Sequence, residues 1–370
     1  MKIGIITYHF ARNYGAILQC YALQTKLLSM GHDVWVLNYK SERQEKNNSL
    51  HHKRDGIVAN LAVNAALLPF EAARKTKERR FAQYESRELR LTPRFRSVDE
   101  MQEYVNSEGF DLLISGSDQV FNPKIADFDY AFLFPFETSA RKGSFAASLG
   151  SATEEDLGCH AEKLREFDVL SVREKTDAPT VQLVCGRSPH VVDDPVFLLD
   201  SSAWAAASGI EMRDDGYVLG YFINKEMSKH YLELTELVAK KLGLPFKVLN
   251  VRYGLDSFRP QMITDAGPEE FLDCFSRASF VCTDSFHGTA FSLIFKKRFI
   301  SFEPKAKSHD WRKRDLLEKT GETMRSVAID NDDARAGVER LCACPALDAM
   351  EGLATIRERQ IAFLNMMLGE

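Results

Sequence analysis

Short apolar segments alternate with segments of helical periodicity along this chain, and this alternation limits the possible folds more than any other feature. Residues 3–7 are predicted to form a strand, residues 15–30 a helix and residues 34–37 a second strand. Gly31 is suited to end the helix, because glycine readily adopts the left-handed conformation found after helix C-termini. A strand, a helix and a strand in succession form a right-handed βαβ unit, so the two strands are expected to be parallel.

The alternation continues through the rest of the chain. Further strands are predicted at 110–114, 141–149, 170–173, 190–192, 217–222, 246–250 and 298–302, and further helices at 231–242, from Gly267 onward and at 354–368. A polar junction at residues 200–202 separates two groups of strands. A chain of 370 residues is expected to form two domains. We therefore expect an α/β fold with two Rossmann-like domains facing across a cleft. Their limits are expected at residues 1–200 and 201–345, and residues 346–370 are expected to form a helix that packs back on the N-terminal domain.

Charge and composition exclude several classes of protein. The net charge of −5 and the pI near 6.1 argue against nucleic acid as a partner, since nucleic-acid binders are normally basic. No apolar run is long enough for a transmembrane helix, and the N-terminal residues lack the pattern of a signal peptide. The seven cysteines are scattered, which favours a reduced, cytoplasmic setting. Cys342 and Cys344 form the one close pair, and no partner follows at zinc spacing.

Residues 53–80 differ from the rest because they combine an apolar stretch with a basic run. Seven basic residues stand against three acidic ones, namely Asp55, Glu71 and Glu78. One interpretation is a segment that contacts the inner membrane surface or a lipid-linked substrate. The alternative is an amphipathic helix that packs on its own domain and leaves its basic face in solvent.

Residues 278–295 carry the clearest chemical signal. An apolar run rich in β-formers ends in Thr283-Asp284-Ser285, and a histidine and a glycine precede a segment of helical spacing. A strand, a tight turn and the first turn of a helix bring backbone N–H groups and the positive end of the helix dipole together, which favours an anion. His287 is the candidate general acid, since a bound phosphate would help to keep it protonated. Asp284 is expected either to orient the histidine or to cap the helix. The neighbouring candidates for binding the anion are Ser285, Gly288 and Thr289.

Basic residues at other predicted strand ends are candidates for gripping the same anion. Arg173 and Lys305 are expected to bind its charged groups, with Lys307 as a further ligand. The alternative for each is a surface charge or a local ion pair, with Glu174 for Arg173 and with Glu303 for the lysines. The pair Asp193-Asp194 suggests a metal site, but the following Pro195 favours a turn, and no metal or other cofactor is expected.

Polar residues in the predicted N-terminal loops suit the hydroxyls and faces of a sugar, and turn formation and capping are the alternative. Asp118 is the candidate base among them. The acceptor-binding candidates are Asn13, Tyr14, Gln19, Ser117, Gln119 and Asn122.

Four motifs in this order resemble the polysaccharide pyruvyl transferase family over nearly the whole chain. They are residues 13–19 (NYGAILQ), 115–123 (SGSDQVFNP), 171–174 (SVRE) and 284–288 (DSFHG). The resemblance implies a GT-B-like pair of Rossmann-type domains and transfer of pyruvyl from phosphoenolpyruvate. The product is a cyclic ketal across two hydroxyls of a sugar acceptor in surface polysaccharide biosynthesis, and a lipid-linked oligosaccharide is one form of that acceptor. It also implies a general acid at His287, with Arg173 and Lys305 as donor ligands.

Two departures from the family pattern are visible. Some members carry an arginine two residues before the histidine, where this chain has Ser285. The missing phosphate contact is then expected from Ser285 itself, from Arg312 or from Arg314. The lysine motif is also shifted, since Glu303-Pro304-Lys305 stands for an Asp-Pro-Lys pattern. Two rival functions share the fold: a glycosyltransferase that uses a nucleotide sugar, and a non-catalytic protein that binds a sugar or a phosphate.

Overall fold

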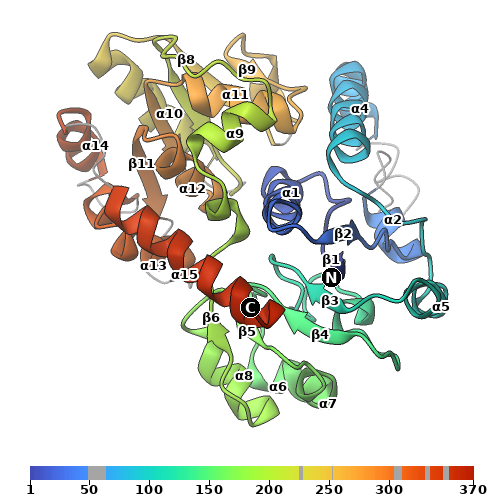
Figure 1. The fold of residues 1–370 in the computed structure, drawn as a ribbon. Helices are drawn as coiled ribbons and strands as arrows, with labels where there is room; N and C mark the ends of the chain where they lie inside the picture. Colours follow the sequence, from blue (N-terminus) through green and yellow to red (C-terminus); the bar gives the residue numbers. More distant parts are fainter. Residues whose placement is uncertain (49–63, 225–227, 252, 304–310, 330–333, 345–349) are drawn as a thin grey trace. The chain divides into compact units, whose positions relative to one another are not determined.

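The computed structural model describes the whole chain except residues 49–63, 225–227, 252, 304–310, 330–333 and 345–349 (Figure 1). The contacts divide the chain into two compact units. The first consists of residues 1–53, 82–199 and 357–370, and the second of residues 54–81 and 200–356. The division after residue 199 falls at the polar junction, while residues 54–81 group with the second unit and residues 357–370 with the first.

The first unit is built on a parallel sheet with the strand order β2-β1-β3-β4. Isolated parallel bridges between Gly143 and Val169 and between Ala147 and Val172 continue this arrangement to the pair β5-β6. Its strands are β1 (Lys2–Ile6), β2 (Asp33–Val36), β3 (Leu112–Ser115), β4 (Arg141–Ser144), β5 (Ser171–Val172) and β6 (His190–Val191). Its helices are α1 (Tyr14–Ser29), α2 (Glu42–Asn47), α5 (Val98–Glu108), α6 (Glu154–Leu157), α7 (Ala161–Arg165) and α8 (Asp177–Cys185), with the 3₁₀ turn η4 (Pro195–Leu198).

The second unit is a six-stranded parallel sheet with the order β12-β11-β10-β7-β8-β9. Its strands are β7 (Val218–Tyr221), β8 (Phe246–Leu249), β9 (Met262–Ile263), β10 (Phe280–Thr283), β11 (Arg298–Glu303) and β12 (Ser326–Ala328). Its helices are α9 (Ser201–Ala207), α10 (Ser228–Leu242), α11 (Pro268–Arg277), α12 (Phe286–Ile294), α13 (Trp311–Lys319) and α14 (Ala334–Cys342). The short turns η1 (Leu68–Phe70) and η5 (Leu255–Phe258) also belong to it. Two long helices, α4 (Glu71–Glu88) and α15 (Met350–Leu368), contribute residues to both units.

The sequence explains why these elements form where they do. Every residue of β3, β7 and β10 is buried, as expected for parallel strands covered on both faces. Asn13 caps α1 by accepting a hydrogen bond from the Gly15 N–H at 2.9 Å. The end of α15 packs Phe363, Leu364 and Met367 into the core of the first unit, beside strand β1. The predicted parallel α/β architecture is confirmed.

Candidate functional site

The carboxyl ends of β7 and β10 adjoin at the point where the strand order of the second unit reverses. From β7 the chain adds β8 and β9 on one side of the sheet and then crosses to the other side for β10, β11 and β12. In open parallel sheets, such a reversal leaves a crevice outside the strand ends in which ligands bind. The residues that follow β10, residues 284–288, therefore form the candidate site of this unit, and we call them the His287 turn.

Asp284 joins the two strand ends. Its carboxylate accepts hydrogen bonds from the backbone N–H groups of Ile223 at 2.8 Å and Asn224 at 2.9 Å, both just beyond β7. Burial raises the pKa of Asp284, while these two hydrogen bonds and the charge of Lys313 lower it. These bonds show a third role besides orienting the histidine or capping the helix: Asp284 fixes the loop after β7 against the His287 turn.

Gly288 allows the first turn of α12 to pack tightly against β10. A methyl group at this position would overlap the Thr283 hydroxyl and lie 2.9 Å from Thr283 Cβ and 3.0 Å from Tyr221 Cδ1. His287 is the second residue of α12 and is half-buried, so it lies within the first helical turn rather than before the helix. Its ring contacts the Phe286 ring edge-on at 5.2 Å between centroids. The close approach of Gly288 thus fixes the place of the candidate acid.

Two predicted donor ligands are involved in internal hydrogen bonds. The Thr289 hydroxyl donates to the Ser285 carbonyl at 3.1 Å and also lies 3.1 Å from Ser301 Oγ. The Ser285 N–H donates to Thr283 Oγ1 at 3.1 Å, and the Ser285 side chain is 3% exposed without capping α12. Ser285 and Thr289 thus lie at the start of α12, and their contacts help to build it.

A buried cation that sequence reasoning missed lies beside this turn. Lys313 on α13 is fully buried; its ammonium donates to the Phe302 carbonyl at 2.6 Å and lies 3.7 Å from Glu303 Oε1. The neighbouring Arg314 is exposed and 3.9 Å from Glu303, and Arg312 is half-buried on the same helix. Leu316 and Leu317, three and four residues after Lys313, were the available signal that Lys313 faces inward. Lys305 and Lys307 lie outside the described residues.

A pocket of about 200 Å³ opens beside the turn, at the ends of β7 and β8. Its lining combines apolar and aromatic side chains with amides and one carboxylate, and among the described residues it includes no lysine or arginine. Ile223 and Asn224, whose N–H groups bind Asp284, are part of the lining. The pocket therefore suits a neutral group held next to the His287 turn.

The first unit has its own reversal of strand order, between β1 and β3. Gln19 is fully buried; its amide donates to Thr7 Oγ1 at 2.8 Å, and the Thr7 hydroxyl donates to the Ser117 carbonyl at 2.9 Å. Asn122 donates to Gln119 Oε1 at 2.6 Å. Of the residues predicted for acceptor binding, Tyr14, Gln19, Ser117 and Asn122 are buried, and Gln119 is partly exposed. Most of these side chains thus take part in capping, internal hydrogen bonds or packing.

Asp118 is held in an unusual backbone conformation. Its φ of 75° lies in the left-handed region, which Asp and Asn adopt more readily than most residues. Its carboxylate accepts the Gln119 N–H at 2.9 Å, and its carbonyl accepts the Ser148 N–H, also at 2.9 Å. The side chain is half-buried, so the strained turn presents a carboxylate at the end of β3.

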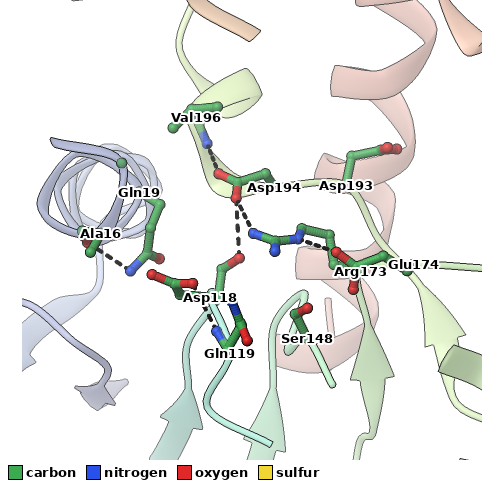
Figure 2. Close-up of polar contacts among 12 residues, drawn as sticks. Ala16, Gln19, Asp118, Gln119, Ser148, Arg173, Glu174, Asp193, Asp194 and Val196 are labelled. Atoms are coloured by element: carbon green, nitrogen blue, oxygen red, sulfur yellow. Dashed lines mark hydrogen bonds and ion pairs between the residues drawn. The ribbon is translucent and has the colours of Figure 1, made fainter. Parts of the chain in front are cut away.

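Figure 2 shows Arg173 between Glu174 and Asp194. The guanidinium donates to each carboxylate at 2.7 Å, and the three side chains are 4%, 8% and 0% exposed. Burial alone would lower the pKa of Arg173, but the charges of Glu174, Asp194 and Asp118 raise it. Asp194 also accepts the Val196 N–H at 3.1 Å as the cap of η4. The turn interpretation of Asp193-Asp194 is therefore confirmed, and no metal-binding cluster occurs among the described residues.

Asp177 completes this buried cluster. It accepts the Leu149 N–H at 2.9 Å. Burial, followed by the charge of Glu174, raises its pKa to about 8. One guanidinium thus faces three carboxylates, and a proton on Asp177 offsets part of the excess negative charge.

Helix α4 shows what the basic segment contacts within the second unit. Lys77 is buried and donates to the Asn250 carbonyl at 3.2 Å, and burial lowers its pKa to about 8. Arg80 lies 2.9 Å from both Asp265 and Glu270. Two of the basic residues therefore hold α4 on its own unit, as the packing alternative expects. Residues 53–63 of this segment lie outside the described residues.

The fold places the chain in a known class. Over 98% of its length it resembles the UDP-GlcNAc 2-epimerase of Methanocaldococcus jannaschii, with a TM-score of 0.55, 12% identity and all of that chain covered. The UDP-GlcNAc 2-epimerase of Neisseria meningitidis has the same TM-score at 9% identity, with 98% of this chain and 99% of that chain covered. The fold is therefore of the GT-B type. None of the described helices is both long and apolar enough to cross a membrane.

The sequence assigns the family within that class. The model of the polysaccharide pyruvyl transferase family matches residues 13–305, which include the DSFHG and SVRE motifs. The chain belongs to the polysaccharide pyruvyl transferase family and is an enzyme. Curated protein sequences give no significant match.

Proposed function

We propose that the protein transfers the pyruvyl group of phosphoenolpyruvate to two hydroxyls of a glycan sugar, forming a cyclic ketal in the biosynthesis of a bacterial surface polysaccharide. The observation that carries the proposal is the His287 turn. It combines a half-buried histidine, a helix N-terminus and a glycine whose packing fixes both at the switch point of the sheet. A small polyanion that needs a proton donor suits this geometry.

In the proposed reaction, His287 donates a proton to the methylene carbon of phosphoenolpyruvate, and an oxocarbenium-like centre forms at the adjacent carbon. A sugar hydroxyl attacks this centre and loses its proton, for which Asp118 is the candidate base. The bond to phosphate then breaks, a second hydroxyl attacks the same carbon, and its proton leaves as well. The products are the ketal and inorganic phosphate. Phosphoenolpyruvate supplies both the pyruvyl group and the leaving phosphate, and the sugar supplies the two ketal oxygens. Atoms and charges therefore balance without a further reactant.

The donor ligands remain proposals of the same kind. The His287 turn supplies backbone N–H groups, and Arg173, Lys305 and Lys307 are proposed to bind the donor's charged groups, with Arg312 and Arg314 near the end of β11. The acceptor is proposed to be a cytoplasmic sugar, either free or lipid-linked. General acid catalysis of this kind contributes on the order of 10²- to 10⁴-fold to the rate, and charge stabilisation adds to it.

The test is incubation of the purified protein with phosphoenolpyruvate and a panel of glycans. We expect release of inorganic phosphate and an acceptor whose mass increases by one pyruvate less one water. His287→Ala should abolish ketal formation and retain donor binding by calorimetry. His230→Ala, which changes a partly exposed histidine on α10, is the matched control and should keep full activity. Release of a nucleotide from a nucleotide sugar, or donor binding without turnover on any acceptor, would overturn the proposal.

A further inference from the structure

Three large apolar side chains are exposed on two short turns of the second unit. Leu68 on η1 is 64% exposed, and Leu255 and Phe258 on η5 are 90% and 61% exposed. Phe70, also on η1, joins the two turns, because its ring lies 4.6 Å from the Phe258 ring and 5.5 Å from the Tyr253 ring. We call Leu68, Leu255 and Phe258 the apolar rim. Single exposed apolar residues are common, whereas a group of them on adjoining turns indicates an interaction surface.

Cations follow the apolar rim along the chain. Arg74, Lys75 and Arg79 lie on α4, which begins directly after Phe70, and Arg259 follows Phe258. Arg74 lies close to the rim's aromatic neighbour: burial raises the pKa of Tyr253 to about 12, and the charge of Arg74 opposes that rise. Lys77 and Arg80 point toward their own unit, as described above, so α4 is anchored while Lys75 and Arg79 are exposed.

Two of these cations, Lys75 and Arg259, have acidic partners that are also at the surface. Lys75 lies 2.6 Å from Glu71, and Arg259 lies 2.9 Å from Glu236 and 3.3 Å from Asp256. Each of these side chains is more than 40% exposed. Exposed ion pairs contribute little to stability, so the cations can exchange these carboxylates for an external anion at small cost.

The apolar rim continues into the pocket beside the His287 turn. Leu255 and Tyr253 belong to the lining of that pocket. A partner that covers the apolar rim would therefore also lie next to the pocket.

We propose that the apolar rim and its flanking cations dock the second unit on an anionic lipid bilayer. The three side chains enter the interface between headgroups and acyl chains, and Arg74, Lys75, Arg79 and Arg259 contact lipid phosphates. A second copy of this chain fits less well, since a stable dimer buries roughly 800 Å² per partner and three side chains offer less. Docking on a bilayer goes beyond the transferase reaction and does not depend on it.

The test is sedimentation of the full chain with vesicles of phosphatidylglycerol and phosphatidylethanolamine, compared with vesicles of phosphatidylcholine. We expect at least tenfold tighter binding to the anionic vesicles, weakening as salt is added. The variant Leu255→Ser/Phe258→Ser should bind them at least tenfold more weakly. Leu183→Ser is the matched control, because Leu183 is 66% exposed and lies in the first unit, and it should bind like the unmodified chain.

Further variants separate charge from apolar contact. Lys75→Gln/Arg79→Gln should reduce the preference for anionic vesicles several-fold and leave the melting temperature unchanged. The proposal is overturned if the unmodified chain does not sediment with the anionic vesicles, or if Leu255→Ser/Phe258→Ser sediments like the control. It is also overturned if sedimentation velocity shows a dimer that the same double variant dissociates, since the rim would then be an interface between copies.

Discussion

Replacing Gly288 by alanine tests whether tight packing positions the His287 turn. The added methyl group would overlap the Thr283 hydroxyl and lie within 3.0 Å of Tyr221 Cδ1. Thr283 is fully buried and donates to the Tyr221 carbonyl at 2.7 Å, so it cannot move without breaking that bond. Overpacking costs about 1–3 kcal/mol, a lost hydrogen bond about 1 kcal/mol, and the better helix propensity of alanine returns up to about 1 kcal/mol. The expected loss in the free energy of unfolding is therefore about 1–3 kcal/mol.

Urea unfolding measures this loss, and a second substitution isolates its cause. Thr283→Ala removes the hydroxyl that the new methyl group would overlap. In that background, Gly288→Ala should cost less, although the methyl group would still lie 2.9 Å from the Cβ of residue 283 and 3.0 Å from Tyr221 Cδ1. The two substitutions should therefore couple by about 1 kcal/mol or more. Gly158→Ala is the control, because Gly158 has helical dihedral angles and a methyl group there meets no atom within 4 Å. It should leave stability unchanged or raise it slightly.

The functional consequence of Gly288→Ala is separate from its stability. If the methyl group displaces the first turn of α12 by about 1 Å, turnover should fall on the order of 10²-fold, measured as phosphate release from phosphoenolpyruvate. A loss of stability below about 0.5 kcal/mol, or no rescue by Thr283→Ala, would refute the packing argument. Normal turnover in a destabilised variant would instead show that the position of His287 does not depend on Gly288.

Three further predictions concern the first unit. Arg173→Gln should lower the free energy of unfolding by about 3–5 kcal/mol, because it leaves Glu174 and Asp194 buried without their cation. The control is Arg213→Gln, which breaks exposed contacts with Glu211 and Asp215 and should cost at most about 1 kcal/mol. In the folded state the pKa of Asp177 is raised to about 8 from an ordinary 3.8. The stabilisation of the folded state that this shift provides is therefore complete below pH 3.8 and is lost as the pH rises toward 8. The free energy of unfolding should thus fall by up to about 1.4 kcal/mol per pH unit across that window, and Asp177→Asn should flatten this slope in urea titrations at several pH values. Asp118→Asn, which keeps a side chain that tolerates a positive φ, should retain donor binding in calorimetry and reduce turnover; unchanged turnover would remove Asp118 as the base.

The sequence predicted those parts of the fold that short-range patterns encode. The strands at β1, β7 and β10 and the helices α1 and α10 lie within a few residues of their expected positions, because apolar runs and helical spacing act over neighbouring residues. The strands β9 and β12, of two and three residues, were missed, whereas β5 and β6, of two residues each, were predicted. The 3₁₀ turns that carry the apolar rim were also missed.

The two candidate sites differ in how much of them a local pattern could predict. The His287 turn consists of five consecutive residues, so its strand, turn and helix could be predicted together. Arg173 binds Asp194, 21 positions away, and the charge balance depends on Asp177 as well. No spacing rule links these residues, because β5, α8 and the segment after β6 bring them together only in the folded unit. Sequence reasoning considered Glu174 as the partner of Arg173 and could not find the other two carboxylates.

The proposed donor role of Arg173 has to be weighed against the two carboxylates that its Nε and Nη1 groups already bind. Its guanidinium already binds two carboxylates at 2.7 Å, and a donor carboxylate or phosphate must replace one of them to reach the same N–H groups. The replaced carboxylate would then be buried beside further negative charge, which raises its pKa and favours uptake of a proton. Donor binding through Arg173 should thus take up a proton, so calorimetry in buffers of different ionisation enthalpy should show proton uptake that is lost in Arg173→Gln. Donor binding without proton exchange in the unmodified protein would leave Arg173 with the structural role that its contacts already show.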